Sequence, residues 1–186
     1  MTKSIVISGP PAVGKTTVAK GLADEFNLTY LSGGDILKEM AIEQGFDVVG
    51  DDWWDTEDGM KFLNQRENNY EFDKKVDDKL IHLFNTGGMV ITSYTLPRLV
   101  SNGIKIWLAG SHDSSSKRMQ TRDNMTSQEA YEITKIRYDK NRALYRKLYH
   151  FDFGNDTSVF DKIIDTDNLN ATQVINIAKE TVRKLL

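Results

Sequence analysis

The feature that most constrains the fold is a strand-like segment that leads through a glycine-rich turn directly into a helical segment. Lys3–Ser8 is a short β-branched run that predicts a buried strand. Gly9–Gly14 forms the turn, and from Lys15 to about Phe26 apolar residues recur at helical spacing. A buried strand followed by a helix is the repeating unit of α/β domains, so the chain is expected to be one of them.

The turn itself fits the phosphate-binding pattern Gly-x4-Gly-Lys-Thr without a mismatch. Backbone N–H groups in such a turn form a nest for phosphate oxygens, and the start of the helix adds a favourable dipole. We therefore predict that Lys15 contacts the β- and γ-phosphates of ATP and that the Thr16 hydroxyl binds Mg²⁺. The predicted nucleotide-binding residues are Gly9, Pro10, Pro11, Ala12, Val13, Gly14, Lys15, Thr16 and Thr17.

Strand-like and helical segments alternate along the rest of the 186 residues. This alternation predicts an α/β fold with a parallel sheet covered by helices on both faces, and the length favours a single domain over 1–186. Further strands are expected at 29–32, 89–94, 104–108 and 162–165. Helices are expected at 35–44, 71–84, 113–122 and 126–149 and after Asn170, with 45–65 irregular or broken helix.

The composition of the chain limits the kinds of molecule that the protein is expected to bind. The chain has no cysteine, which suits a reducing compartment, and no apolar run approaches the ~20 residues of a membrane span. Its formal net charge of -3 implies no general affinity for nucleic acid. We expect a cytoplasmic protein that acts on small molecules and has neither membrane nor nucleic-acid partners. The sequence does not distinguish a monomer from a dimer.

Basic residues gather in the second half of the chain. Arg118 and Arg122 are four residues apart and share a helix face, whereas Arg137 and Arg142 diverge by roughly 140° on a straight helix. Phosphoryl transfer spreads negative charge that arginines stabilise, so these four residues and Lys15 are the catalytic candidates. The alternative is a solvated helical face with salt bridges to Asp123, Glu132 or Asp139.

Several longer stretches resemble a known family. "LSGGDILKEM" at 31–40 resembles the Gly-Asp-(apolar)-(apolar)-Arg element of nucleoside monophosphate kinases, which implies that Asp35 and Lys38 open an acceptor site. "IKIWLAGSHDSSSKRMQTRDNMTSQEA", "KIRYDKNRALYRKLYHFDF" and "NYEFDKKVDDKL" are similar to archaeal-type cytidylate kinases. The matching residues are Arg118, Arg122, Arg137, Asn141, Arg142, Tyr145, Asp73 and Asp77.

The resemblance implies a P-loop kinase fold with three layers and sheet order 2-3-1-4-5. It also implies a helical acceptor-binding insertion at about 35–85 and a small lid at about 113–128. The implied activity is Mg-ATP-dependent phosphoryl transfer to a nucleoside monophosphate, CMP or dCMP by preference. A general base is not required, because the acceptor is already an ionised phosphate. The alternatives are a kinase for another small acceptor and a nucleotide-binding regulator without transfer activity; a nucleic-acid-processing ATPase is least favoured.

Two regions depart from the family pattern. Where the third strand of the family ends in a carboxylate, glycine and arginine, this chain has Thr92, Ser93 and Tyr94. Tyr94 is a candidate to stack on the acceptor base and Arg98 to replace the missing arginine, with plain structural roles as the alternative. The acidic insert around Trp53 and Trp54 is interpreted as a packing element, with a base platform or a metal site as the other readings.

Overall fold

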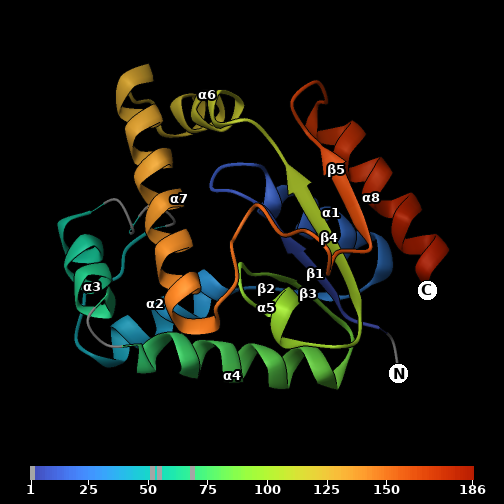
Figure 1. Ribbon diagram of the computed structural model, residues 1–186, viewed down its shortest axis with the longest axis horizontal. Coiled ribbons are helices and arrows are strands. Elements are labelled where there is room, and N and C mark those ends of the chain that lie inside the picture. Colours follow the sequence, from blue (N-terminus) through green and yellow to red (C-terminus); the bar gives the residue numbers. More distant parts are fainter. Residues whose placement is uncertain (1–2, 51–52, 54–55, 68–69) are drawn as a thin grey trace.

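Five parallel strands form the sheet at the centre of the protein (Figure 1), in a computed structural model that describes residues 3–50, 53, 56–67 and 70–186. The strand order is β2-β3-β1-β4-β5, which confirms the order 2-3-1-4-5. The strands are β1 (Ile5–Ser8), β2 (Thr29–Ser32), β3 (Met89–Thr92), β4 (Ile104–Ala109) and β5 (Lys162–Asp165).

Helices cover both faces of this sheet, as the alternation predicts. Figure 1 shows α1 and α8 on one side, α4 running across the other, and α7 standing beside α6. The helices are α1 (Lys15–Phe26), α2 (Gly33–Glu43), α3 (Glu57–Glu67), α4 (Glu71–Thr86), α5 (Leu96–Leu99), α6 (His112–Asp123), α7 (Ser127–Tyr149) and α8 (Ala171–Leu185). Among the described residues, no helix combines the length and apolar character needed to cross a membrane.

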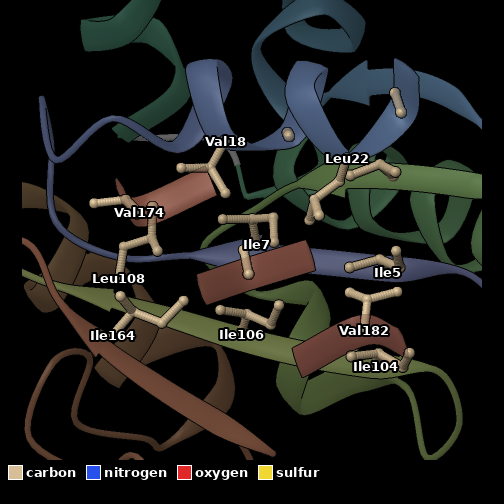
Figure 2. Close-up of a cluster of buried hydrophobic side chains, with 14 of the residues drawn as sticks. Ile5, Ile7, Val18, Leu22, Ile104, Ile106, Leu108, Ile164, Val174 and Val182 are labelled. Carbon is tan, nitrogen blue, oxygen red and sulfur yellow. The ribbon is translucent and has the colours of Figure 1, made fainter. Parts of the chain in front are cut away.

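The main core lies between the sheet and the α1–α8 layer. Because side chains alternate along a strand, Ile5 and Ile7 of β1 face this layer, while Val6 between them faces the other way. Figure 2 shows Ile5 and Ile7 beside Ile104 and Ile106 of β4. The helical side of the same cluster includes Val18, Leu22, Val174 and Val182.

The opposite face carries a second core and a smaller aromatic cluster. Val6 and Ile91 pack with α2, α4 and α5 through residues such as Leu80 and Phe84. Trp53 belongs to this core: it is buried, and its ring lies 5.7 Å from that of Phe62. The packing interpretation of Trp53 is therefore confirmed, whereas Trp54 lies outside the described residues. The aromatic cluster, which joins β4 to α7, is built on Trp107, Tyr145 and Phe153.

The last two long helices begin with side-chain caps at the positions where the sequence places their starts. Thr126 and Glu129 form a capping box at the start of α7, and the Asn170 side chain accepts from the backbone of Gln173 at the start of α8.

The structure differs from the expectation at two places. The third strand ends at Thr92 rather than Tyr94, because the Ser93 hydroxyl accepts from the backbone N–H groups of Thr95 and Leu96 and turns the chain into α5. The segment at 45–65, expected as irregular or broken helix, contains a regular helix, α3, that continues to Glu67 and packs Phe62 into the core.

Candidate functional site

The phosphate-binding turn is shaped by two glycines with unusual backbone angles. Gly14 has φ +99° and caps α1, and Gly9 has φ +150°. A Cβ at Gly9 would collide with the backbone oxygen of Leu108 in β4, so only glycine lets the turn lie this close to the sheet. Val13 anchors the turn in the main core. The turn is thus held rigidly between β1, β4 and α1.

Lys15 points back across this turn. Its Nζ donates to the carbonyl oxygens of Gly9, at 3.0 Å, and Pro10, at 2.6 Å, and lies 4.8 Å from the centre of the Tyr94 ring. Burial lowers the pKa of Lys15; Tyr94 acts in the opposite direction, and the nearby Arg137 lowers the pKa further. Lys15 and Arg137 therefore concentrate positive charge beside a turn that is suited to binding phosphate.

A cleft of about 830 Å³ opens from Lys15 and Thr16. This volume lies within the range of about 300–1,000 Å³ that is usual for small-molecule sites. Its walls come from the first turns of α1 and α2, from α4, from the loop after β3, and from α7. Ligands of open α/β sheets bind beyond the carboxyl ends of the strands, and the cleft lies at that edge of β2 and β3, whose last residues Ser32 and Thr92 line it.

One face of α7 forms a long wall of the cleft. The lining residues recur every three or four positions, so they share a helix face. Those that carry positive charge are Arg137, Lys140 and Lys147. The other residues of this face are Ile133, Ile136, Asn141, Ala143, Leu144 and Tyr145. This wall offers cations spaced along an otherwise largely apolar surface.

The facing wall, on α4, carries two buried carboxylates. Asp73 and Asp77 are each 5% exposed and stand one turn apart, so both face the cleft. Asp77 accepts hydrogen bonds of 2.5 Å from the hydroxyls of Thr95 and Tyr149. The carboxylates and the α7 cations therefore line the same cavity.

The structure brings only one of the four candidate arginines into this cleft. Arg137 lines it beside Lys15. Arg142 forms an ion pair of 2.6 Å with Asp152, in keeping with the different directions of Arg137 and Arg142 on the helix.

Both α6 arginines lie elsewhere. Arg118 donates to the backbone oxygen of Thr166, at 2.7 Å, just beyond β5. Arg122 is exposed and pairs with Asp123. The catalytic roles of Arg118, Arg122 and Arg142 stay predictions.

The four predicted acceptor residues also differ in whether they line the cleft. Tyr94 lines the cleft. Arg98 lies on α5 and pairs with Asp156 at 2.5 Å, and Lys38 donates to the backbone oxygen of Gly50 at 2.8 Å. Asp35 forms the capping box of α2 with Ser32. Of these four, only Tyr94 is among the residues that line the cavity, and the acceptor roles of the others stay predictions.

The donor groups present suit Mg²⁺ bound together with a nucleotide. Thr16 lies at the start of α1 and lines the cleft, where its hydroxyl is available as one ligand. Mg²⁺ in such sites usually keeps several waters and takes the rest of its ligands from substrate phosphates. No cluster of three or more metal-binding side chains occurs within the described part of the chain. Thr16 therefore fits a phosphate-bound ion rather than a dedicated protein cage.

Some cleft residues were not among the candidates drawn from the sequence. Tyr70, Lys140 and Lys147 line the cavity, and the Lys147 ammonium lies 4.8 Å from the centre of the Tyr70 ring. The sequence signal that could have identified the two lysines is the spacing of Arg137, Lys140, Leu144 and Lys147, which places them on one helix face.

The sheet order, the phosphate-binding turn and the cleft beyond the strands define a P-loop kinase fold. A shikimate kinase from Acinetobacter baumannii has the same architecture, with a TM-score of 0.60 at 16% identity over 99% of this chain and 94% of that chain. The chain belongs to the cytidylate kinase-like family, whose model matches residues 4–168.

Curated relatives agree with this placement over almost the whole chain. A cytidylate kinase from Pyrobaculum islandicum is 32% identical over 98% of this chain and 94% of its own length. A cytidylate kinase from Sulfurisphaera tokodaii is also 32% identical, over 98% of this chain and 96% of its own. The resemblance described from the sequence is thereby confirmed.

Proposed function

We propose that the protein transfers the γ-phosphoryl group of Mg-ATP to a nucleoside monophosphate, with CMP or dCMP preferred. The observation that carries the proposal is that Lys15, Thr16 and Arg137 share one cleft with the buried carboxylates Asp73 and Asp77. Membership of the cytidylate kinase-like family supports the same reaction. In this proposal α2–α4 form the acceptor-binding insertion, and α6 with the start of α7 forms the lid, within one domain.

The donor end is the phosphate-binding turn. Its backbone N–H groups and the start of α1 receive the phosphates, and Lys15 neutralises charge on the β- and γ-phosphates. Mg²⁺, held by the phosphates and Thr16, would supply further charge neutralisation. Arg137, which lines the cleft near Lys15, would stabilise charge that moves to the bridging oxygen during transfer.

The reaction needs no residue to remove a proton. An oxygen of the acceptor phosphate forms the new bond to the γ-phosphorus, while the bond to the β–γ bridging oxygen breaks and leaves ADP. Since the acceptor oxygen is already ionised near neutral pH, positioning and charge stabilisation supply the catalysis. The cations along α7 offer contacts for the acceptor phosphate.

The α4 wall supports a base that carries an amino group. Ionised carboxylates only accept hydrogen bonds, so Asp73 and Asp77 suit the exocyclic amino group of cytosine better than the carbonyl of uracil at the same position. Asp77 already receives two hydroxyl donors, so we assign the contact with the base to Asp73.

The test is a panel of acceptors in a coupled assay for ADP release. CMP, dCMP, UMP, AMP and GMP are each offered with Mg-ATP, together with shikimate and gluconate as acceptors of other kinases that share the fold. Lys15→Ala protein purified in parallel reports contaminating kinases. Release of ADP that depends on CMP or dCMP supports the proposal. Nucleotide binding without turnover for any acceptor would instead identify a regulator.

A further inference from the structure

The side chain of Tyr94 faces the donor end of the cleft. The centre of its ring lies 4.8 Å from the Lys15 ammonium. The ring is held by two aromatic neighbours, at 5.2 Å edge-on to Phe153 and at 6.1 Å from Tyr145. These neighbours belong to the cluster that joins β4 to α7. The ring that faces Lys15 is therefore fixed by packing from several elements.

Lys15 needs such a partner because its surroundings disfavour its charge. Burial lowers the pKa of Lys15, and the Arg137 guanidinium on α7 lowers it again. Lys140 and Lys147 add positive charge along the same wall, while Asp73 and Asp77 provide the negative charge on α4. An aromatic face attracts a cation, and the attraction grows as the pair is desolvated.

We propose that Tyr94 is a positioning residue for the donor site, which holds the Lys15 ammonium at the mouth of the phosphate-binding turn before a nucleotide binds. Two carbonyl oxygens of the turn and the side chain of Tyr94, through its ring and its hydroxyl, define this resting position together. The inference rests on the proposed binding of ATP phosphates by that turn. It differs from base stacking, which would place the role of Tyr94 with the acceptor.

The consequence is preorganisation. A lysine that is already cationic and held beside the turn loses little further freedom when phosphates arrive, so more of the interaction energy appears as affinity. Without the Tyr94 side chain, Lys15 keeps its partly buried position and its cationic neighbours but lacks the support for its charge. Binding of the donor nucleotide should then weaken, while binding of the acceptor stays as it was.

The experiment compares Tyr94→Leu, which removes the ring, with Tyr94→Phe, which keeps it. Each variant is titrated by calorimetry with a non-hydrolysable Mg-ATP analogue and, separately, with CMP. Tyr94→Leu should weaken binding of the analogue about three- to tenfold. Tyr94→Phe keeps the ring but loses the hydroxyl that also supports the charge of Lys15, so its affinity should lie between those of Tyr94→Leu and wild type. Both variants should bind CMP like wild type. Normal binding of the analogue by Tyr94→Leu, or a change confined to CMP, would overturn the inference.

A spectroscopic measurement on the wild-type protein removes the dependence on how the leucine variant folds. A ring above the ammonium shifts the NMR signals of the Lys15 ε-methylene group upfield, and Lys15→Ala identifies these signals. The shift should be present in the nucleotide-free protein, and its absence would refute the resting position. If the protein binds no Mg-ATP analogue at all, the proposed function fails, whereas this measurement still decides whether Tyr94 holds Lys15.

Discussion

The carboxylate of Asp77, in the middle of α4, accepts a hydrogen bond of 2.5 Å from the phenol of Tyr149, the last residue of α7. Its other oxygen accepts from the Thr95 hydroxyl in the loop after β3. Three segments that border the cleft therefore meet at one buried side chain. Burial raises the pKa of Tyr149 above its usual range, and the hydrogen bond to Asp77 raises it further, so the phenol stays protonated and remains a donor.

Tyr149→Phe should lower the free energy of unfolding by about 1–2 kcal/mol, because it leaves a buried carboxylate one donor short. Tyr138→Phe is the matched control: it makes the same chemical change on the same helix, but its hydroxyl donates to the neutral backbone oxygen of Phe153 at 3.2 Å. Urea unfolding of both variants measures the difference. Equal losses of unfolding free energy in the two variants would show that the Asp77–Tyr149 hydrogen bond contributes no more to stability than the Tyr138–Phe153 bond.

Lys15→Ala should reduce turnover at least 100-fold, because it removes the cation beside the phosphate-binding turn. Stability should not fall, since burial already disfavours the charge of Lys15. Lys20→Ala, an exposed lysine of the same helix, serves as the control. Steady-state ADP release and thermal unfolding are measured together, and a Lys15→Ala protein that keeps a third of wild-type turnover would refute the assigned donor site.

Arg137→Ala should lower kcat by about 100-fold and raise the KM for ATP much less, because charge at the bridging oxygen grows in the transition state. Arg118→Ala and Arg122→Ala should have smaller effects, since these side chains bind Thr166 and Asp123. Arg146→Ala is the control, because Arg146 is an exposed arginine on the same helix. A larger effect at Arg122 than at Arg137 would require the lid to close much further than this structure shows.

Asp73→Asn should lower the preference for CMP over UMP about tenfold. This factor corresponds to the loss of one hydrogen bond of about 1.4 kcal/mol. The amide places a donor where the carboxylate only accepts, which favours a carbonyl on the base. The ratio of kcat/KM values for the two acceptors is the measurement. Asp78→Asn, on the exposed side of α4, should leave that ratio unchanged, and an unchanged ratio in Asp73→Asn would move base recognition elsewhere.

The ion pair between Arg142 and Asp152 predicts a pH dependence of stability. Hydrogen bonds from Arg142 and Asn155 lower the pKa of Asp152 to about 2, against about 3.9 in an unfolded chain. A lowered pKa means that the stabilisation is present above about pH 4 and is lost as the pH falls toward 2. Urea midpoints between pH 5 and 2.5 should therefore fall more steeply in wild type than in Arg142→Gln. Lys184→Gln, an exposed change of equal charge, should follow wild type.

Much of the fold was predictable because local signals agree with the final packing. The limits of α1, β2 and β5 follow directly from their apolar patterns and turns. Strand β3 was expected to reach Tyr94, but the Ser93 hydroxyl binds two backbone N–H groups and starts a helical turn instead. The segment that contains α3 was expected only as irregular or broken helix, since polar residues dominate its sequence and the helix depends on packing of Phe62 against the rings of Phe46 and Phe72.

The site was predictable only where one short segment carries it. The phosphate-binding turn is contiguous, so its pattern places Lys15 and Thr16 without tertiary information. The destination of each arginine depends on partners far along the chain, as with Arg118 and Thr166, which are 48 residues apart. In the sequence, Arg118 and Arg137 are both basic residues of the second half of the chain. Only the packing of α6 and α7 shows that Arg137 lines the cleft and that Arg118 binds Thr166.

Helix α7 is a single rigid body of 23 residues, fixed near its C-terminal end by Tyr149 and Arg142. At 1.5 Å per residue it is about 34 Å long, so a tilt of about 10° at the fixed end would carry Thr126 through roughly 6 Å. Arg137 lies near the middle and would travel about half as far. In the proposed function, contacts that an acceptor makes near the fixed end of α7 would therefore move Arg137 and, with it, the packed α6 at the other end of the helix.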